Sequence, residues 1–283
     1  MNVDAVSALE RGAAFVNLSS WWKVGVGGAD AGGWLNDLLS AELSELSAGE
    51  GRGSLLLTPT GRIRAAVTVT LFEDEYLLVQ DPRQPSRIDQ LLDPYILSSD
   101  VILRDRTDEL GLIAFPNRES PPIEGAATFS PSTLGPGTDV ITERATAPSD
   151  LVEADPGAVE AWRIRCGMAR FPIDLGTDSL PHEAEVKEMI AYGKGCFLGQ
   201  EAVARVRNLG HPPFVLLAAD APAQVAVGET IVTDEREAGT VTSVADDGQS
   251  TALIARVRWA LKDSPLRTSS GVELVSRGLA SAA

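Results

Sequence analysis

One cysteine of the chain stands in a segment whose residue types could make a thiol reactive. Residues 194–206 read KGCFLGQEAVARV, and the run from Gly199 onward has the composition of a helix. A thiol just before a helix start lies near unpaired N–H groups and the positive end of the helix dipole. Lys194 adds positive charge beside Cys196, whereas Glu201 opposes it. The segment therefore predicts a position at Cys196 that favours the thiolate.

A structural role for this cysteine is the alternative, because free cysteines are among the most buried residue types. The two histidines of the chain, His182 and His211, are not neighbours of Cys196, so the sequence offers no base for a protease-type nucleophile. No cysteine–histidine cluster has the spacing of a zinc site. From residue types alone, a reactive thiol and a packing residue both stay open.

The second cysteine follows a segment with clear helix boundaries, DPGAVEAWRIRCG. Asp155 is placed as its N-cap and Gly167 as its C-cap. Val159, Trp162 and Cys166 share one face at helical spacing. Cys166 is therefore predicted to be a packing residue.

A pair of tryptophans could supply a stacking surface for a flat ligand. Residues 15–28, FVNLSSWWKVGVGG, are predicted to form a short strand region with a glycine-rich end. Neighbouring residues of a strand point to opposite faces of the sheet. If one of Trp21 and Trp22 packs in a core, the other is left for a ligand ring.

The elements that must position these residues begin with strands and two helices. Residues 54–82 give the clearest β signal: Val67 and Val69 alternate with threonines, residues 73–75 form an acidic turn, and residues 76–80 return as a second strand. Residues 30–46 have the apolar spacing of a helix. A further helix is predicted to begin at a cap on Ser86 and to end or bend at Pro94.

The second half of the chain is predicted to be irregular at first and then all β. Residues 116–150 are rich in proline and read as a connection with a few short strands. From Phe214 onward, short strands separated by Gly and Asp predict a small antiparallel barrel or sandwich. We expect three units, at residues 1–115, 116–211 and 212–283.

The formal net charge of the 283-residue chain is -16. A charge of this sign repels a phosphate backbone, so direct nucleic-acid binding is not expected. No apolar run of about 18 residues is present, and the first residues lack the basic and apolar regions of a signal peptide. We therefore expect a cytoplasmic protein without membrane contact.

The segment 194–206 resembles the Lys-Gly-Cys-aromatic-x-Gly-Gln-Glu signature of the YgfZ family, folate-binding relatives of the glycine-cleavage T-protein. Three further stretches occur in the order that this family has. They are VNLSSWWKVGVGGADAGGWLNDLLS, RIRCGMARFPIDLGTDSLPHEAE and the C-terminal strands from Phe214. The resemblance spans nearly the whole chain, with the cysteine segment as its diagnostic part.

This resemblance implies an α+β fold, with a T-protein-like ring of α+β subdomains around a central folate pocket and a C-terminal antiparallel β-barrel. It implies tetrahydrofolate or a folate derivative as the ligand. It also implies iron–sulfur enzymes as clients, including radical enzymes that thiolate tRNA, whose assembly or repair the protein would support.

The resemblance also implies the site residues. The signature makes Cys196 the candidate reactive thiol, accompanied by Lys194, Gln200, Glu201 and Arg205.

Two tryptophans of the family contact folate. The first matches Trp21, with Trp22 beside it. The ungapped match to the second is Val159, and Trp162 lies one turn later on the same helix face.

The T-protein relatives transfer an aminomethyl-derived carbon to tetrahydrofolate and carry an aspartate pair before an apolar strand. The matching stretch is TPTGRIRAAVTVTLF, with Arg64-Ala65 at the place of the pair. Without that carboxylate, proton transfer and charge stabilisation in such a reaction lack their agent. Aminomethyl transfer is therefore kept as the alternative function.

A second alternative is a non-catalytic folate-sensing chaperone. Arg52, Arg62 and Arg64 could bind the glutamate part of a folate, or they could be solvated loop charges.

Overall fold

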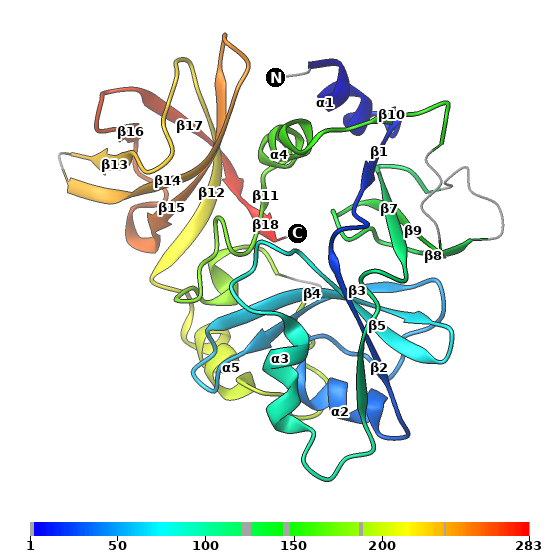
Figure 1. Cartoon of the computed structure of the whole chain (residues 1–283). Helices are drawn as coiled ribbons and strands as arrows, with labels where there is room; N and C mark the ends of the chain where they lie inside the picture. The colour runs from blue at the N-terminus through cyan, green and yellow to red at the C-terminus, as the bar shows by residue number, and fades with distance from the viewer. Residues whose placement is uncertain (1–2, 120–125, 144–147, 187–188, 235, 283) are drawn as a thin grey trace.

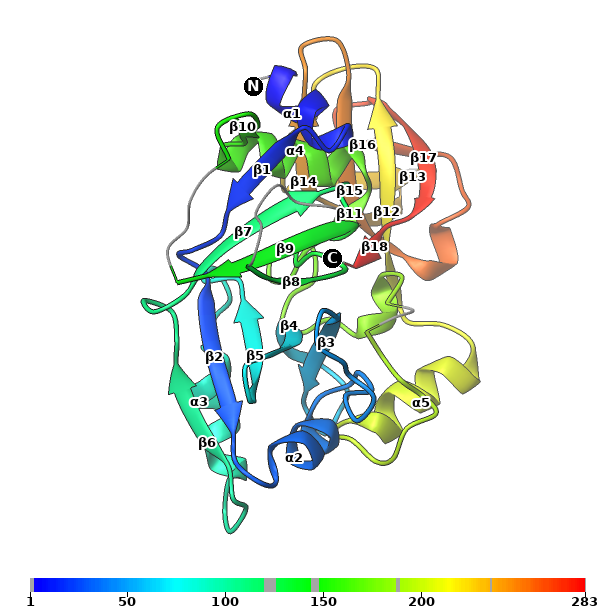
Figure 2. The same cartoon turned by 90° about the vertical axis from the view of Figure 1, so that its right-hand side faces the viewer.

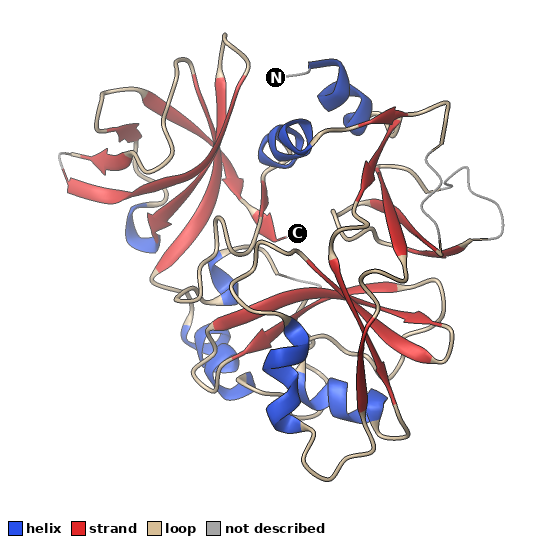
Figure 3. Cartoon of the chain, viewed as in Figure 1, coloured by secondary structure: helices blue, strands red, loops and turns tan. Residues whose placement is uncertain are grey.

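The protein folds into three β-structured units around a common centre (Figure 1). The computed structural model describes residues 3–119, 126–143, 148–186, 189–234 and 236–282. Two five-stranded sheets and a closed six-stranded barrel lie within these ranges, and their short helices lie outside the sheets (Figure 3). The predicted α+β fold with a C-terminal antiparallel barrel is confirmed. No helix of the described residues is long and apolar enough to cross a membrane.

The first sheet has the strand order β3-β4-β5-β2-β6. Its strands are β2 (Trp22–Gly27), β3 (Gly51–Leu57), β4 (Ile63–Phe72), β5 (Glu75–Gln80) and β6 (Ile102–Asp105). Strands β4 and β5 form the predicted hairpin. The helices α2 (Ala31–Leu38) and α3 (Ile88–Leu92) share a hydrophobic core with this sheet, so they cover one of its faces.

The second sheet has the order β10-β1-β7-β9-β8. Its strands are β1 (Ala14–Asn17), β7 (Gly111–Pro116), β8 (Ala127–Phe129), β9 (Gly137–Thr142) and β10 (Val152–Glu153). Strand β1 pairs with β10, although they lie on opposite sides of residue 115 in the chain. The division of the chain into units 1–115, 116–211 and 212–283 stays a prediction.

Helix α4 (Pro156–Arg165) packs against α1 (Val3–Glu10) and against the barrel (Figure 1). The Asp155 carboxylate accepts the N–H groups of Gly157 at 2.8 Å and Ala158 at 3.0 Å, which confirms the predicted N-cap. The predicted role of Cys166 is wrong, because its side chain is exposed. Cys166 is the C-cap of this helix, where the chain leaves the buried face.

The barrel has the order β12-β15-β14-β13-β16-β17. Its strands are β12 (Phe214–Ala221), β13 (Thr230–Thr233), β14 (Arg236–Asp246), β15 (Thr251–Arg258), β16 (Leu266–Thr268) and β17 (Glu273–Leu279). Helix α5 (Gln200–Leu209) precedes the barrel and lies below it in Figure 2. After the barrel, β18 (Ser281–Ala282) pairs in parallel with β11 (Met168–Ala169), which returns the chain to the centre.

Three short 3-10 helices complete the described chain: η1 (Asp93–Tyr95), η2 (Pro181–Glu183) and η3 (Trp259–Leu261).

Two predicted helix boundaries are wrong. The helix expected for residues 30–46 ends at Leu38, because Leu39 has an extended backbone. Ser86 does not cap α3, because the side chain of Gln80 accepts the Ile88 N–H at 2.7 Å and so replaces the cap. Pro94 lies in η1, so the predicted end of this helix is confirmed.

Candidate functional site

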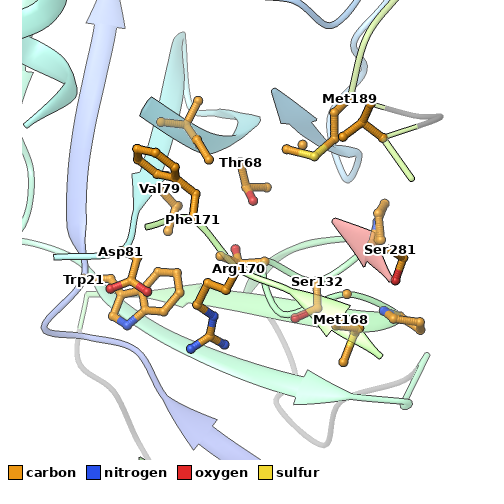
Figure 4. Close-up of a pocket in the computed structure, with 18 of the residues that line it drawn as sticks. Trp21, Thr68, Val79, Asp81, Ser132, Met168, Arg170, Phe171, Met189 and Ser281 are labelled. Carbon is orange, nitrogen blue, oxygen red and sulfur yellow. The ribbon is translucent and has the colours of Figure 1, made fainter. Parts of the chain in front are cut away.

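A cavity of about 370 Å³ lies where the first sheet meets the loop before β9 and strand β11 (Figure 4). Such a volume lies at the lower end of small-molecule sites, which span about 300–1,000 Å³. Strands β4 and β5 line one side, and residues from the loop, from β11 and from the segment after η2 line the others. The lining is mostly apolar, with a few polar groups, as in a typical site for an organic ligand.

Trp21 lines this cavity from the turn before β2 (Figure 4). The backbone N–H of Trp21 donates to the carbonyl oxygen of Leu18 at 2.8 Å. The buried ammonium of Lys23 donates to the carbonyl oxygens of Ser19 at 2.8 Å and Trp21 at 2.7 Å. Burial lowers the pKa of Lys23 from 10.5 to about 8. These bonds fix the turn and therefore the position of the Trp21 ring.

Trp22 is not among the residues that line the cavity. It begins β2, and the guanidinium of Arg87 lies 5.5 Å from the centre of its ring. The two neighbouring rings thus have different surroundings, and a folate contact by either remains a prediction.

Strand β4 contributes no carboxylate to the cavity. Ala66 and Thr68 line it, whereas Ala65 is buried in the core between the sheet and its helices. The side chain of Gln84 accepts the Ala66 N–H at 3.0 Å and donates to its carbonyl at 2.7 Å. Arg64 is not a lining residue and donates to the hydroxyl of Tyr95 at 3.4 Å.

A carboxylate reaches the cavity from Asp81, directly after β5, which the sequence analysis did not single out. Arg83 holds it in place, because its Nε lies 3.0 and 3.1 Å from the two carboxylate oxygens and its Nη2 donates at 2.6 Å. Asp81 is buried, so this ion pair neutralises its charge inside the protein. Both carboxylate oxygens of Asp81 are therefore already engaged by Arg83.

Arg170 places a guanidinium at the cavity (Figure 4). Its side chain is buried, and burial lowers its pKa from 12.5 to about 10, with Arg163 and Arg83 adding to the effect. The Nη1 atom lies 3.6 Å from Glu160 Oε2. Among the described residues, its side chain has no other ion pair and no hydrogen bond. Sequence reasoning missed this residue, because nothing in RFPID marks an arginine as buried.

The loop before β9 is fixed by one buried acid. Asp139 accepts the hydroxyl of Ser132 and, at 2.8 Å, the N–H of Thr133. Burial raises the pKa of Asp139 from 3.8 to about 6, although these hydrogen bonds oppose the shift. Thr133 Oγ1 is itself buried without a hydrogen-bond partner, and Thr133 lines the cavity. A ligand with a polar edge could satisfy this atom.

The signature segment docks on the end of helix α2. Lys194 Nζ donates at 2.6 Å to each of the carbonyl oxygens of Asn36, Leu39 and Ala41. All three ammonium protons therefore have acceptors, and these carbonyls are the groups that a helix end leaves unpaired. Burial lowers the pKa of Lys194 to about 8. Lys194 is thus held by α2 rather than free to interact with the thiol.

The packing around Gly199, directly before α5, also requires a residue without a side chain. Gly199 has a φ of 84°, and a Cβ there would lie 2.5 Å from the carbonyl oxygen of Thr58. Phe197 is buried in the largest core cluster. The segment is therefore built to pack tightly between α2 and the β3–β4 turn.

Cys196 is exposed and does not line the cavity. Gln200 Nε2 donates to the carbonyl of Gly195 at 3.3 Å. Glu201 and Arg205 form a surface ion pair at 3.2 Å, with both side chains mostly in solvent. The structure brings none of the signature residues into the cavity, and it leaves Cys196 accessible to another molecule.

The second pair of predicted folate residues lies away from the cavity lining. Val159 and Trp162 are buried in the core beneath α4, and Trp162 Nε1 has no hydrogen-bond partner. Of the three arginines considered for the glutamate part, Arg52 pairs with Glu50 at 3.4 Å. Arg62 donates to the carbonyl of Asp178, and none of the three lines the cavity.

No metal site accompanies the cavity in the part of the chain that the structure describes. It contains no group of three or more His, Cys, Asp or Glu side chains that could hold a metal ion.

The arrangement of the two sheets and the barrel places the chain in the T-protein-like class of folds. The crystal structure of aminomethyltransferase T of the glycine cleavage system from Bartonella henselae matches with a TM-score of 0.78 and 16% sequence identity. The match covers 96% of this chain and 87% of that chain. At this identity, the likeness establishes the fold.

Sequence comparison gives the same class. An aminomethyltransferase of Streptomyces avermitilis is 25% identical over 286 residues, covering 86% of this chain and 77% of that protein. One of Pelodictyon phaeoclathratiforme is 24% identical over 243 residues, covering 71% and 66%. A chloroplastic protein of Arabidopsis thaliana with a provisional transferase name is 23% identical over 278 residues, covering 85% of this chain. This chain spans 63% of the Arabidopsis protein's length. No family model matches the chain.

Proposed function

We propose that the chain is a folate-binding protein that supports the assembly or repair of iron–sulfur enzymes, including enzymes that thiolate tRNA. The observation that carries the folate part is a cavity lined both by Trp21 and by Arg170, a buried residue whose guanidinium makes no hydrogen bond among the described residues and only a 3.6 Å ion pair with Glu160. A pterin is a flat ring with hydrogen-bonding edges, so it needs a stacking partner and donors. The residues present fit that ligand, and the unpartnered Thr133 Oγ1 adds one more polar group.

The cavity supports binding rather than aminomethyl transfer. A transfer of this kind needs a group that moves a proton at the reacting centre. Ala66 and Thr68 line the cavity from β4. Of the described residues, two with carboxylates line it, Asp81 and Glu185, and that of Asp81 is already bound by Arg83. Both oxygens of Asp81 are thus held by the guanidinium of Arg83.

The iron–sulfur part rests on the signature segment. Lys194, Phe197 and Gly199 each have a packing role in the fold. Cys196 is exposed, between residues that pack against the rest of the fold. A fixed, accessible thiol suits a reaction with a partner protein better than one with a ligand inside the cavity, which supports action on client enzymes.

A titration of tryptophan fluorescence with folinic acid and with tetrahydrofolate tests the folate part. The wild type is expected to show a saturable change. Trp21→Ala should weaken binding about tenfold or more through loss of the stacking surface. Trp22→Ala is the matched control, because the neighbouring ring does not line the cavity. An unchanged signal at millimolar ligand, confirmed by calorimetry, would remove the proposal.

Aminomethyl transfer remains the second candidate, because the Streptomyces and Pelodictyon relatives are aminomethyltransferases. The test incubates the protein with tetrahydrofolate and an aminomethylated lipoyl carrier protein and follows ammonia release. We expect none above the uncatalysed rate. Release that depends on the protein and is lost in Asp81→Asn would favour transfer over the proposed role.

A further inference from the structure

Arg170 has a hydrogen-bonding capacity that the described residues leave unused. It is 8% exposed, and its guanidinium carries five N–H donors. The nearest carboxylate oxygen, Glu160 Oε2, lies 3.6 Å from Nη1, which is longer than a hydrogen bond. Its backbone N–H, not its side chain, binds Asp174. The Arg170 side chain lines the cavity, so its N–H groups can donate to an oxygen that a ligand brings there.

The charges around Arg170 are already balanced. Arg83 is paired with Asp81, and Arg163 donates to Asp174 at 2.8 Å and also to Glu160. Three cations thus face three carboxylates: Arg83, Arg163 and Arg170 with Asp81, Glu160 and Asp174. Glu185 also lines the cavity, so no positive charge among these described residues is left over for an anionic ligand.

This balance decides which end of a folate suits the cavity. The glutamate end carries two negative charges, and placing it here would leave both uncompensated in a buried site. A neutral ring oxygen accepts from Arg170 without adding charge. The ring end is therefore the part that enters, and the glutamate stays outside.

We propose that Arg170 makes this cavity selective for 4-oxo pterins, with its guanidinium donating to the oxygen at C4 while the ring lies against Trp21. The inference rests on the proposed folate binding and adds the end and the ring chemistry that the cavity takes. Figure 4 shows the guanidinium and the Trp21 ring on the same side of the cavity. A 4-amino pterin replaces that oxygen with an N–H donor, so the guanidinium loses its acceptor at C4 and faces a donor there.

Folic acid and its 4-amino analogue aminopterin test this directly, because they differ only at C4. Isothermal titration calorimetry measures both affinities. The wild type should bind folic acid about tenfold or more tightly than aminopterin, as expected for the loss of a hydrogen bond to a charged group. Arg170→Gln should weaken the binding of folic acid and abolish its preference over aminopterin. Arg258→Gln removes an exposed barrel arginine and should keep it.

A second pair of compounds tests the orientation. Pteroic acid, which lacks the glutamate, should bind the wild type nearly as well as folic acid does. The fragment p-aminobenzoylglutamate, which lacks the pterin, should bind weakly and without regard to Arg170. The wild-type affinities of the two compounds test the orientation even if Arg170→Gln does not fold, and tight binding of the fragment to the wild type would overturn it.

The outcomes separate this inference from the function on which it rests. If the wild type binds folic acid but binds aminopterin equally or more tightly, the selectivity is overturned and folate binding stands. Loss of p-aminobenzoylglutamate affinity in Arg170→Gln overturns the orientation. Absence of binding by every compound overturns the proposed function, and this inference with it.

Discussion

The ammonium nitrogen of Lys23 lies 2.7 Å from the carbonyl oxygen of Trp21. Lys23 is buried in strand β2, whereas the ring of Trp21 lines the cavity. A charge outside the cavity therefore holds the residue whose ring forms part of the wall.

Lys23→Met removes both bonds to the turn and should weaken folate binding by about tenfold. It should also change the pH dependence of stability. The pKa of Lys23 is about 8 in the folded chain and 10.5 in the unfolded one, so between these values the unfolded chain binds more protons. Lys23 therefore contributes rising stability as pH increases from about 8 to 10.5.

Urea unfolding of wild type and Lys23→Met from pH 7 to 11 checks the pH prediction. The difference in unfolding free energy should grow in favour of the wild type as pH rises through this window. A difference that stays level with pH would contradict the assigned shift. A Lys23→Met protein that binds folate normally would contradict the role of Lys23 in placing Trp21.

Lys194→Met should destabilise the fold rather than disable a thiol. It leaves the carbonyls of Asn36, Leu39 and Ala41 without their shared donor. We expect a loss of about 2–4 kcal/mol in unfolding free energy. Arg205→Ala, which removes a solvent-exposed ion pair of the same signature, should change it by less than about 0.5 kcal/mol. Similar losses for the two variants in chemical denaturation would show that Lys194 has no capping role.

The sequence predicts the fold well where patterns are local. The β4–β5 hairpin, the Asp155 cap and the C-terminal barrel follow from alternation, cap residues and turn residues, all of which act within a few positions. The end of α2 does not follow from a local pattern, because Lys194 lies more than 150 residues along the chain from the carbonyls it binds. The Gln80 side chain that replaces the Ser86 cap is likewise a tertiary contact.

The candidate site shows the same limit. Trp21 stands out in the sequence as one of two adjacent aromatic residues. The sequence does not mark Arg170, Asp81 or Thr133. Their place in the site depends on burial and on the partners within hydrogen-bond distance, which the sequence does not show. Conversely, the signature residues Gln200, Glu201 and Arg205 are conspicuous in sequence and lie on the surface of the α5 region.

Asp139 should make the protein more stable in mild acid than at neutral pH. Its pKa is about 6 in the folded chain against 3.8, so the native state binds more protons between these values. The stability that Asp139 contributes is therefore fully present below about pH 4 and is lost as pH rises through 6, by about 3 kcal/mol at most.

Asp139→Asn cannot titrate, so its stability relative to wild type should rise by this amount between pH 4 and 7 and then stay level. Denaturant melts at pH steps of 0.5 measure it, and Asp155→Asn, at an exposed cap, serves as the control. A flat difference across this range would mean that Asp139 is ionised throughout.

Cys196→Ala should leave the fold and folate binding unchanged but abolish function in the cell. The side chain is exposed and does not line the cavity, so its removal creates no void and takes away no ligand contact. Cys166→Ala is the matched control, since Cys166 is also exposed but caps a helix away from the signature.

Each variant is expressed in cells that lack the protein, and tRNA methylthiolation is quantified by mass spectrometry. Cys166→Ala should restore the modification to the wild-type level, whereas Cys196→Ala should not. Equal restoration by both would show that the thiol of Cys196 takes no part in the proposed role, because folding and ligand binding would then account for all of the activity.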